Sequence, residues 1–146
     1  MTINILDEFG YCIWLLPQIG HKWYNYTNGF KPHITIDKYL GKKSVQKKRA
    51  TINFDTSVNI KLVGKLYQTK TNNFYALQYN VECDGYKPIW WPDDAHISFQ
   101  YKYHIPFTED EINTIDNKIT INSGVMDIIQ ITHCIGDFST WKKITI

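Results

Sequence analysis

Cysteine is scarce in this chain and has no paired spacing. The sequence of 146 residues contains three cysteines, Cys12, Cys83 and Cys134, which lie far apart. A zinc site or a dithiol redox motif needs cysteines or histidines at short, regular intervals, and a disulfide framework needs an even number of cysteines. The sequence indicates none of these arrangements. We expect all three cysteines to be buried thiols.

Long hydrophobic runs and a strong charge of either sign are also absent. No apolar stretch approaches the roughly 20 residues of a membrane-spanning helix. Residues 1–4 lack the basic and apolar segments of a signal peptide. The net charge is only +2, too small for a protein that coats long duplex nucleic acid by charge alone. We expect a cytoplasmic protein with no membrane partner, and the oligomeric state stays open.

Apolar and aromatic residues are plentiful enough for one folded domain. Hydrophobic residues make up 43 % of the sequence and aromatic residues 15 %, which is typical of a globular chain and not of a disordered one. The length fits a single domain over residues 1–146. No linker or low-complexity segment divides it.

The hydrophobic pattern predicts an α+β fold of many strands and a few short helices. Two alternating segments, 60–67 and 74–81, flank a turn-like stretch and predict a hairpin. Thr108 stands three residues before Glu111, a capping box that predicts the start of a short helix. The remaining expected elements are strands at 11–16, 31–39, 95–103, 125–135 and 141–146, and a helix near 44–53.

Two short words share one pattern: PHITI at residues 32–36 and AHISF at residues 95–99. Successive side chains of a strand point to opposite faces, so each histidine shares a face with the hydroxyl two residues later. Each word offers an imidazole that exchanges protons near neutral pH, beside a hydroxyl that binds an anionic oxygen. One such word alone is more simply interpreted as a plain sheet strand. The pair predicts two half-sites that flank one phosphate.

The strand of the second word alternates between apolar and polar residues. Ile97, Phe99 and Tyr101 alternate with His96, Ser98 and further polar residues. This pattern is typical of a sheet with one solvated face. It predicts that His96 and Ser98 face water and that Tyr101 faces the core.

On these two words the chain resembles the 2H phosphoesterases, a family named for two His-x-Ser/Thr words flanked by apolar residues. The resemblance covers the two words and the order of the elements around them. It implies a two-lobed α+β fold in which antiparallel sheets flank a central cleft. Carried over by position, the catalytic roles fall on His33, Thr35, His96 and Ser98. The separation between the two motif histidines looks short for the family, which implies a compact member without an accessory domain.

Members of this family open 2′,3′-cyclic phosphates on RNA ends, cleave 2′,5′-linked oligoadenylates, trim RNA tails or, in phages, hydrolyse cyclic di- and trinucleotides of immune signalling. The small size and the aromatic flanks resemble the last group most. The resemblance therefore implies a viral enzyme of the host cytoplasm that cleaves cyclic or short linear oligonucleotide signals. The alternatives are an RNA end-processing 2′,3′-cyclic phosphodiesterase and a module that sequesters a nucleotide without cleaving it.

The implied chemistry is general acid/base catalysis by two histidines without a metal ion or other cofactor. One neutral imidazole accepts a proton from the nucleophile and one charged imidazole donates to the leaving oxygen, each worth about 10² to 10⁴ in rate. Thr35 and Ser98 would bind the non-bridging oxygens. Which histidine is the base stays open. A metal site is the rival chemistry, because Asp37 shares a strand face with His33, but no further ligand spacing supports it.

Two further features bear on substrate binding. Aromatic residues precede both words, and bases stack on such rings at about 1 to 3 kcal/mol each. From these we select Trp90, Trp91 and Tyr24 as substrate-binding candidates, with core packing as the alternative. A basic segment at residues 42–49 follows the first word. It is interpreted as a solvated helix face, with attraction of a phosphate toward the cleft as the alternative.

Overall fold

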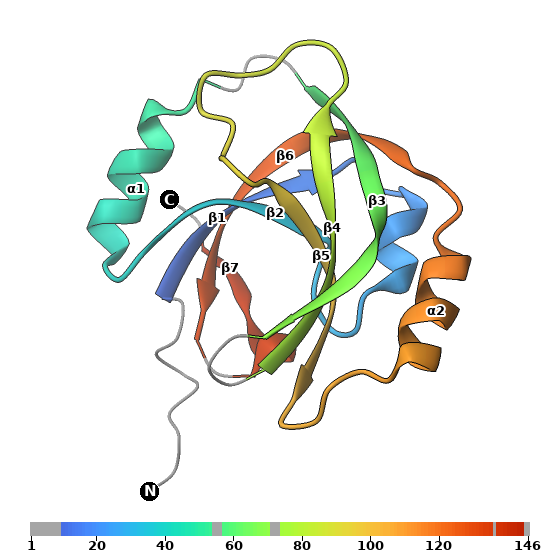
Figure 1. Ribbon diagram of the computed structural model, residues 1–146. Helices are drawn as coiled ribbons and strands as arrows, with labels where there is room; N and C mark the ends of the chain where they lie inside the picture. Colours follow the sequence, from blue (N-terminus) through green and yellow to red (C-terminus); the bar gives the residue numbers. More distant parts are fainter. Residues whose placement is uncertain (1–9, 54–56, 71–73, 136, 145–146) are drawn as a thin grey trace, which may run out of the picture.

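The structure is a computed structural model that describes residues 10–53, 57–70, 74–135 and 137–144. Its fold is α+β, as predicted (Figure 1). The strands are β1 Gly10–Pro17, β2 His33–Tyr39, β3 Val58–Lys70, β4 Phe74–Cys83, β5 His96–Tyr103, β6 Ser123–Cys134 and β7 Lys142–Ile144. The helices are α1 Lys42–Thr51 and α2 Glu109–Lys118, with 3-10 turns η2 Lys22–Tyr26 and η3 Phe138–Thr140.

The strands form one connected antiparallel sheet with the order β1-β2-β5-β4-β3-β6-β7. A further pairing between β1 and β6 closes the first six strands into a ring. In Figure 1 the two α-helices lie on opposite sides of this ring. The antiparallel arrangement is confirmed, and the two motif strands, β2 and β5, are neighbours. The division into two lobes stays a prediction.

The local sequence signals produce the elements they predict. The hairpin is the antiparallel pair β3 and β4, although residues 71–73 of its turn lie outside the described residues. The capping box is complete: Glu111 N donates to Thr108 Oγ1 (3.1 Å), and Thr108 N donates to Glu111 Oε1 (2.9 Å). Of the predicted last strand, residues 142–144 form β7, and residues 145–146 are not described.

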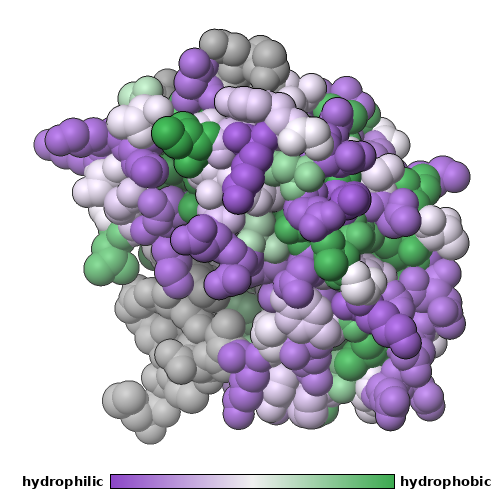
Figure 2. All heavy atoms as spheres, turned by 45° about the horizontal axis from the view of Figure 1, so that its top comes forward, coloured by the Kyte–Doolittle hydropathy of each residue, from purple (hydrophilic) through white to green (hydrophobic). Residues whose placement is uncertain are grey.

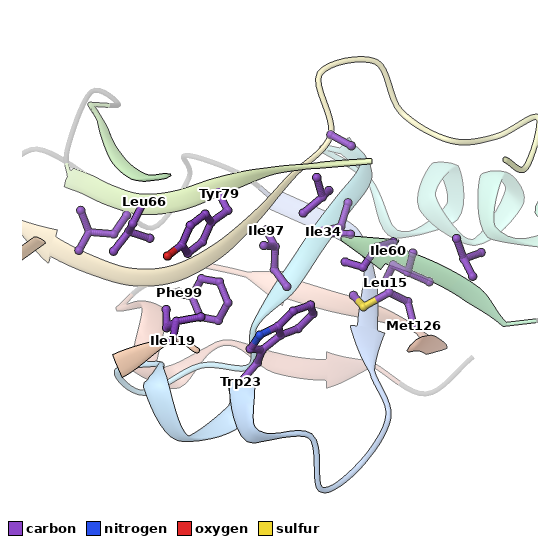
Figure 3. Packing of buried hydrophobic residues seen from close by; sticks show 14 of the residues in the cluster. Leu15, Trp23, Ile34, Ile60, Leu66, Tyr79, Ile97, Phe99, Ile119 and Met126 are labelled. Atoms are coloured by element: carbon purple, nitrogen blue, oxygen red, sulfur yellow. The ribbon is translucent and has the colours of Figure 1, made fainter. Parts of the chain in front are cut away.

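The main core lies on one face of the ring strands. Its buried residues come from all six of these strands (Figure 3). Trp23 of η2 is fully buried and joins opposite parts of the ring: its ring packs edge-on against Phe99 of β5, 6.1 Å between centroids, and its Nε1 donates to Ile121 O (2.8 Å) just before β6. Ile34 and Ile97, the central residues of the two words, are also fully buried here. Their histidine neighbours therefore point to the opposite face.

The surface drawn in Figure 2 is mostly hydrophilic, with small groups of apolar residues between. No helix formed by the described residues is both long and apolar enough to cross a membrane. Cys12 and Cys134 are buried free thiols, as predicted, whereas Cys83 is half-buried. The prediction of full burial is wrong for Cys83, because this last residue of β4 only packs against the margin of the main core.

Candidate active site

The two words meet on neighbouring strands. In the antiparallel pair β2 and β5, His33 lies opposite Ser98 and Ile34 lies opposite Ile97. Directly opposed residues share a face, and so do residues two apart along one strand. Thr35 lies two residues after His33, and His96 lies two residues before Ser98. The four predicted catalytic side chains therefore lie on one face.

All four side chains line one cavity of about 560 Å³. Both hydroxyls and both imidazoles reach it, together with the aromatic rings of Trp14 and Tyr101. Lys38 and Lys70 also line it, as do the carboxylates of Asp37 and Asp93. The cavity is of the size that holds a small ligand. It brings together groups that exchange protons and groups that bind anionic oxygens.

Ring stacking and hydrogen bonds fix the orientation of the His33 imidazole. Its ring stacks on Trp14, 3.7 Å between centroids and 11° between planes, and Phe30 packs edge-on against it at 5.4 Å. Its Nδ1 lies 2.7 Å from Lys31 O, and its Nε2 lies 3.2 Å from the hydroxyl of Tyr101. A carbonyl oxygen only accepts, so Nδ1 carries the proton and the Tyr101 hydroxyl donates to Nε2. The nitrogen facing Tyr101 is therefore a proton acceptor.

A hydrogen bond of the same kind orients His96. Its Nδ1 lies 3.2 Å from Asp94 O, again the carbonyl two residues before the histidine. Nδ1 therefore carries the proton here too, and Nε2 is left for the cavity. Asp94 has a φ of 51°, a left-handed conformation that is costly for a residue other than glycine. This turn aims the carbonyl at the imidazole.

The two imidazoles differ in burial. His33 is only 2 % exposed, and this burial lowers its pKa to about 3, against the opposing effect of the bond to Lys31 and with a further lowering from the nearby His96. His96 is half-buried. His33 is therefore neutral at pH 7 in the ligand-free protein.

The burial of His33 makes stability depend on pH. The unfolded chain binds a proton at this histidine below about pH 6.5, whereas the folded protein does not until about pH 3. The free energy of unfolding should therefore fall as pH decreases through this window, by about 2 to 3 kcal/mol between about pH 8 and about pH 4.5. Urea unfolding of wild type and His33→Gln at several pH values measures this contribution. A difference between the two proteins that stays constant with pH contradicts it.

The covered state of this face corrects a prediction from the sequence. His33 and Ser98 are 2 % and 4 % exposed, so aromatic rings cover the face that was expected to meet water. Tyr101 is one of these covering rings and does not lie on the core face. A bulge in β5 is the reason: Gln100 pairs with Leu77 but Ser98 with Gln78, so Phe99 is an extra residue and Tyr101 turns to the side of Ser98.

Tyr101 and Trp14 are the site residues that sequence reasoning missed. A hydrogen bond from Ser98 reaches the Tyr101 oxygen, and burial raises the pKa of this phenol above its ordinary value. Ser98, Tyr101 and His33 thus form one chain of hydrogen bonds. Trp14 faces the site by the ordinary alternation of β1, which places it on the same side as Cys12 and Leu16. A second bulge lies opposite it in β2, where Ile36 is the extra residue. The words themselves carry no signal for either bulge.

The predicted substrate-binding aromatics lie apart from this cavity. Trp90 packs on the core and its Nε1 donates to Asn53 O (2.9 Å). Trp91 lines a separate cavity beside β4, and Tyr24 lines another cavity, which adjoins the site. None of these three belongs to the lining around the histidines.

The basic segment and Asp37 also take other places. The cations of residues 42–49 lie on α1, none of them in the cavity lining, where Lys38 and Lys70 stand instead. Asp37 lines the cavity, but its carboxylate accepts from Tyr39 Oη and from Lys38 N, both at 2.9 Å. Within the described ranges, no three His, Cys, Asp or Glu side chains are grouped so that they could hold a metal ion.

In comparisons with known proteins, no protein-family model and no curated protein matches this chain. The functional interpretation therefore depends on the geometry of the site.

Proposed function

We propose that the protein is a phosphodiesterase of the 2H type that cleaves cyclic or short oligonucleotides. The observation that carries this proposal is the paired arrangement of the two words. Two imidazoles, each held through Nδ1 by the carbonyl two residues before it, share one cavity with two hydroxyls. A phosphodiester needs this set of groups: one proton acceptor, one proton donor and donors to the non-bridging oxygens.

The difference in burial supports one assignment of the two roles. His33, neutral before substrate enters, is the general base and takes a proton from a ribose hydroxyl or a water molecule. Its Nε2 accepts a hydrogen bond from Tyr101, so this is the nitrogen that would accept the proton. The phosphate anion raises the pKa of His33 once bound, because an opposite charge favours the imidazolium. His33 is thus a stronger base when the phosphate is bound than in the ligand-free protein.

The remaining groups complete the reaction. The oxygen of the nucleophile forms a bond to phosphorus while the bond to the leaving oxygen breaks. His96, in its charged form, gives its Nε2 proton to that oxygen. Thr35 and Ser98 donate to the non-bridging oxygens, and Lys38 and Lys70 line the same cavity and offset the phosphate charge. This scheme assigns every proton transfer to a residue of the chain.

A substrate panel tests the proposal. Wild-type protein is incubated with 2′,3′-cyclic AMP, a 2′,5′-linked oligoadenylate and cyclic di-AMP, each with and without excess chelator, and the products are separated by chromatography. We expect at least one diester to be cleaved, at a rate that the chelator does not change. No cleavage of any diester would indicate a sequestering module, and loss of cleavage with chelator would indicate metal chemistry; either result overturns the proposal.

A further inference from the structure

A second cavity adjoins the site on the other side of an aromatic wall. Its volume is about 530 Å³, and it shares Trp14 and Trp141 with the histidine cavity. Tyr24 and Phe30 add further aromatic surface to it. The same tryptophan that stacks on His33 therefore forms a wall of both cavities.

The charges of this second cavity are positive. Lys31 and Lys143 line it, and among the residues that the structure describes no Asp or Glu side chain does. The ammonium group of Lys31 donates to Gln130 Oε1 (3.2 Å), another lining residue, which directs the cation to the cavity. Burial, with a smaller contribution from Asp127, raises the pKa of Tyr24 to about 12, and Asp127 is outside the lining. The cavity beside β4, by contrast, carries Glu82 and two aspartates against one lysine.

The aromatic walls are held in fixed orientations. Trp14 packs edge-on against Trp141 at 6.0 Å between centroids, and Phe30 stacks on Tyr101 at 4.3 Å. The hydroxyl of Tyr24 donates to Pro17 O (2.5 Å). Fixed rings beside cations are what a nucleotide requires, because its base stacks on aromatic faces and its phosphate binds ammonium groups.

We infer that this second cavity is a subsite for a second nucleotide of the substrate, with a phosphate between Lys31 and Lys143 and a base against the aromatic walls. Lys31 connects the two cavities directly, because its carbonyl holds His33 while its side chain lines the subsite. The inference rests on the proposed function and narrows it. The substrate has at least two nucleotides, cyclic or linear, and is not a mononucleotide 2′,3′-cyclic phosphate.

Binding to a catalytically disabled protein tests the subsite. In a His96→Gln background, calorimetric titration with the linear dinucleotide pApA is compared with titration with AMP. Lys143→Ala should weaken the binding of pApA relative to AMP by about tenfold, the loss typical of one charge-assisted hydrogen bond. Lys31→Ala should act in the same direction. Both lysines are exposed, so neither variant endangers the fold.

Lys42→Ala is the matched control, because Lys42 is an exposed lysine of α1 outside this lining. Lys42→Ala should leave the affinity for pApA relative to that for AMP unchanged. Equal weakening by all three variants, or no weakening by Lys31→Ala and Lys143→Ala, overturns the inference. If wild type cleaves diesters while the lysine variants bind pApA normally, the subsite inference fails and the phosphodiesterase proposal stands. If pApA binding requires Lys143 but no diester is cleaved, the subsite stands and the phosphodiesterase proposal fails.

Discussion

Replacement of His96 by glutamine should slow turnover of the cleaved diester by about 10² to 10⁴, because a general acid contributes that much to the rate. Glutamine keeps a polar side chain of similar reach but has no proton to give near neutral pH. KM should change much less than kcat, since the hydroxyls and cations proposed to bind the phosphate remain. His33→Gln should lose activity to a similar extent through loss of the base. Steady-state kinetics on the diester that wild type cleaves measures both.

His104→Gln is the control for this experiment. His104 directly follows β5, is exposed and does not line the cavity. Its variant should keep wild-type kinetics within about twofold, an energy difference well under 1 kcal/mol. His96 is only half-buried, so His96→Gln should remain folded, which circular dichroism verifies. Full activity of His96→Gln, or an equal loss in His104→Gln, would remove the assignment of His96 as the acid.

Trp23→Ala should lower the free energy of unfolding by about 3 to 5 kcal/mol, the usual cost of removing a buried tryptophan. Trp23 is fully buried, packs on Phe99 and bonds to Ile121 O. Its ring also fills the space beside Gly124, where an added Cβ would lie 2.8 Å from the indole. The surrounding structure relaxes only partly around such a gap, so a cavity penalty is added to the lost burial. Urea denaturation at neutral pH measures the change.

Tyr86→Ala is a suitable comparison for Trp23→Ala, because Tyr86 is 69 % exposed. Truncation of an exposed aromatic residue should change the unfolding free energy by less than about 0.5 kcal/mol. A loss of stability in Trp23→Ala no larger than that in Tyr86→Ala would contradict the position of Trp23 at the centre of the core.

Local signals in the sequence predicted most of the fold. The capping box at Thr108 and the alternation in β4 depend on neighbours within a few residues, so they act in the same way whatever surrounds them. The closure of the sheet between β1 and β6 has no such signal. It depends on pairing between segments about a hundred residues apart, which only the assembled core selects.

The site could be predicted only in part for the same reason. Each word reports a histidine and a hydroxyl on one strand face, and the structure gathers all four in one cavity. The sequence could not show that Tyr101 turns toward His33, because one extra residue in β5 reverses the alternation. It could not show the burial of His33 either, since the rings that cover it come from β1 and from the segment before β2. In the proposed mechanism, that burial distinguishes the base from the acid.

A double-mutant comparison of the two histidines tests most directly whether both imidazoles act on one phosphate. The kcat of His33→Gln, His96→Gln and the double variant is measured on the same diester. Groups that act as a unit are strongly non-additive, so the double variant should be about as slow as the slower single variant. Effects that multiply in the double variant would show that the two histidines act independently, and the shared site would then be wrong.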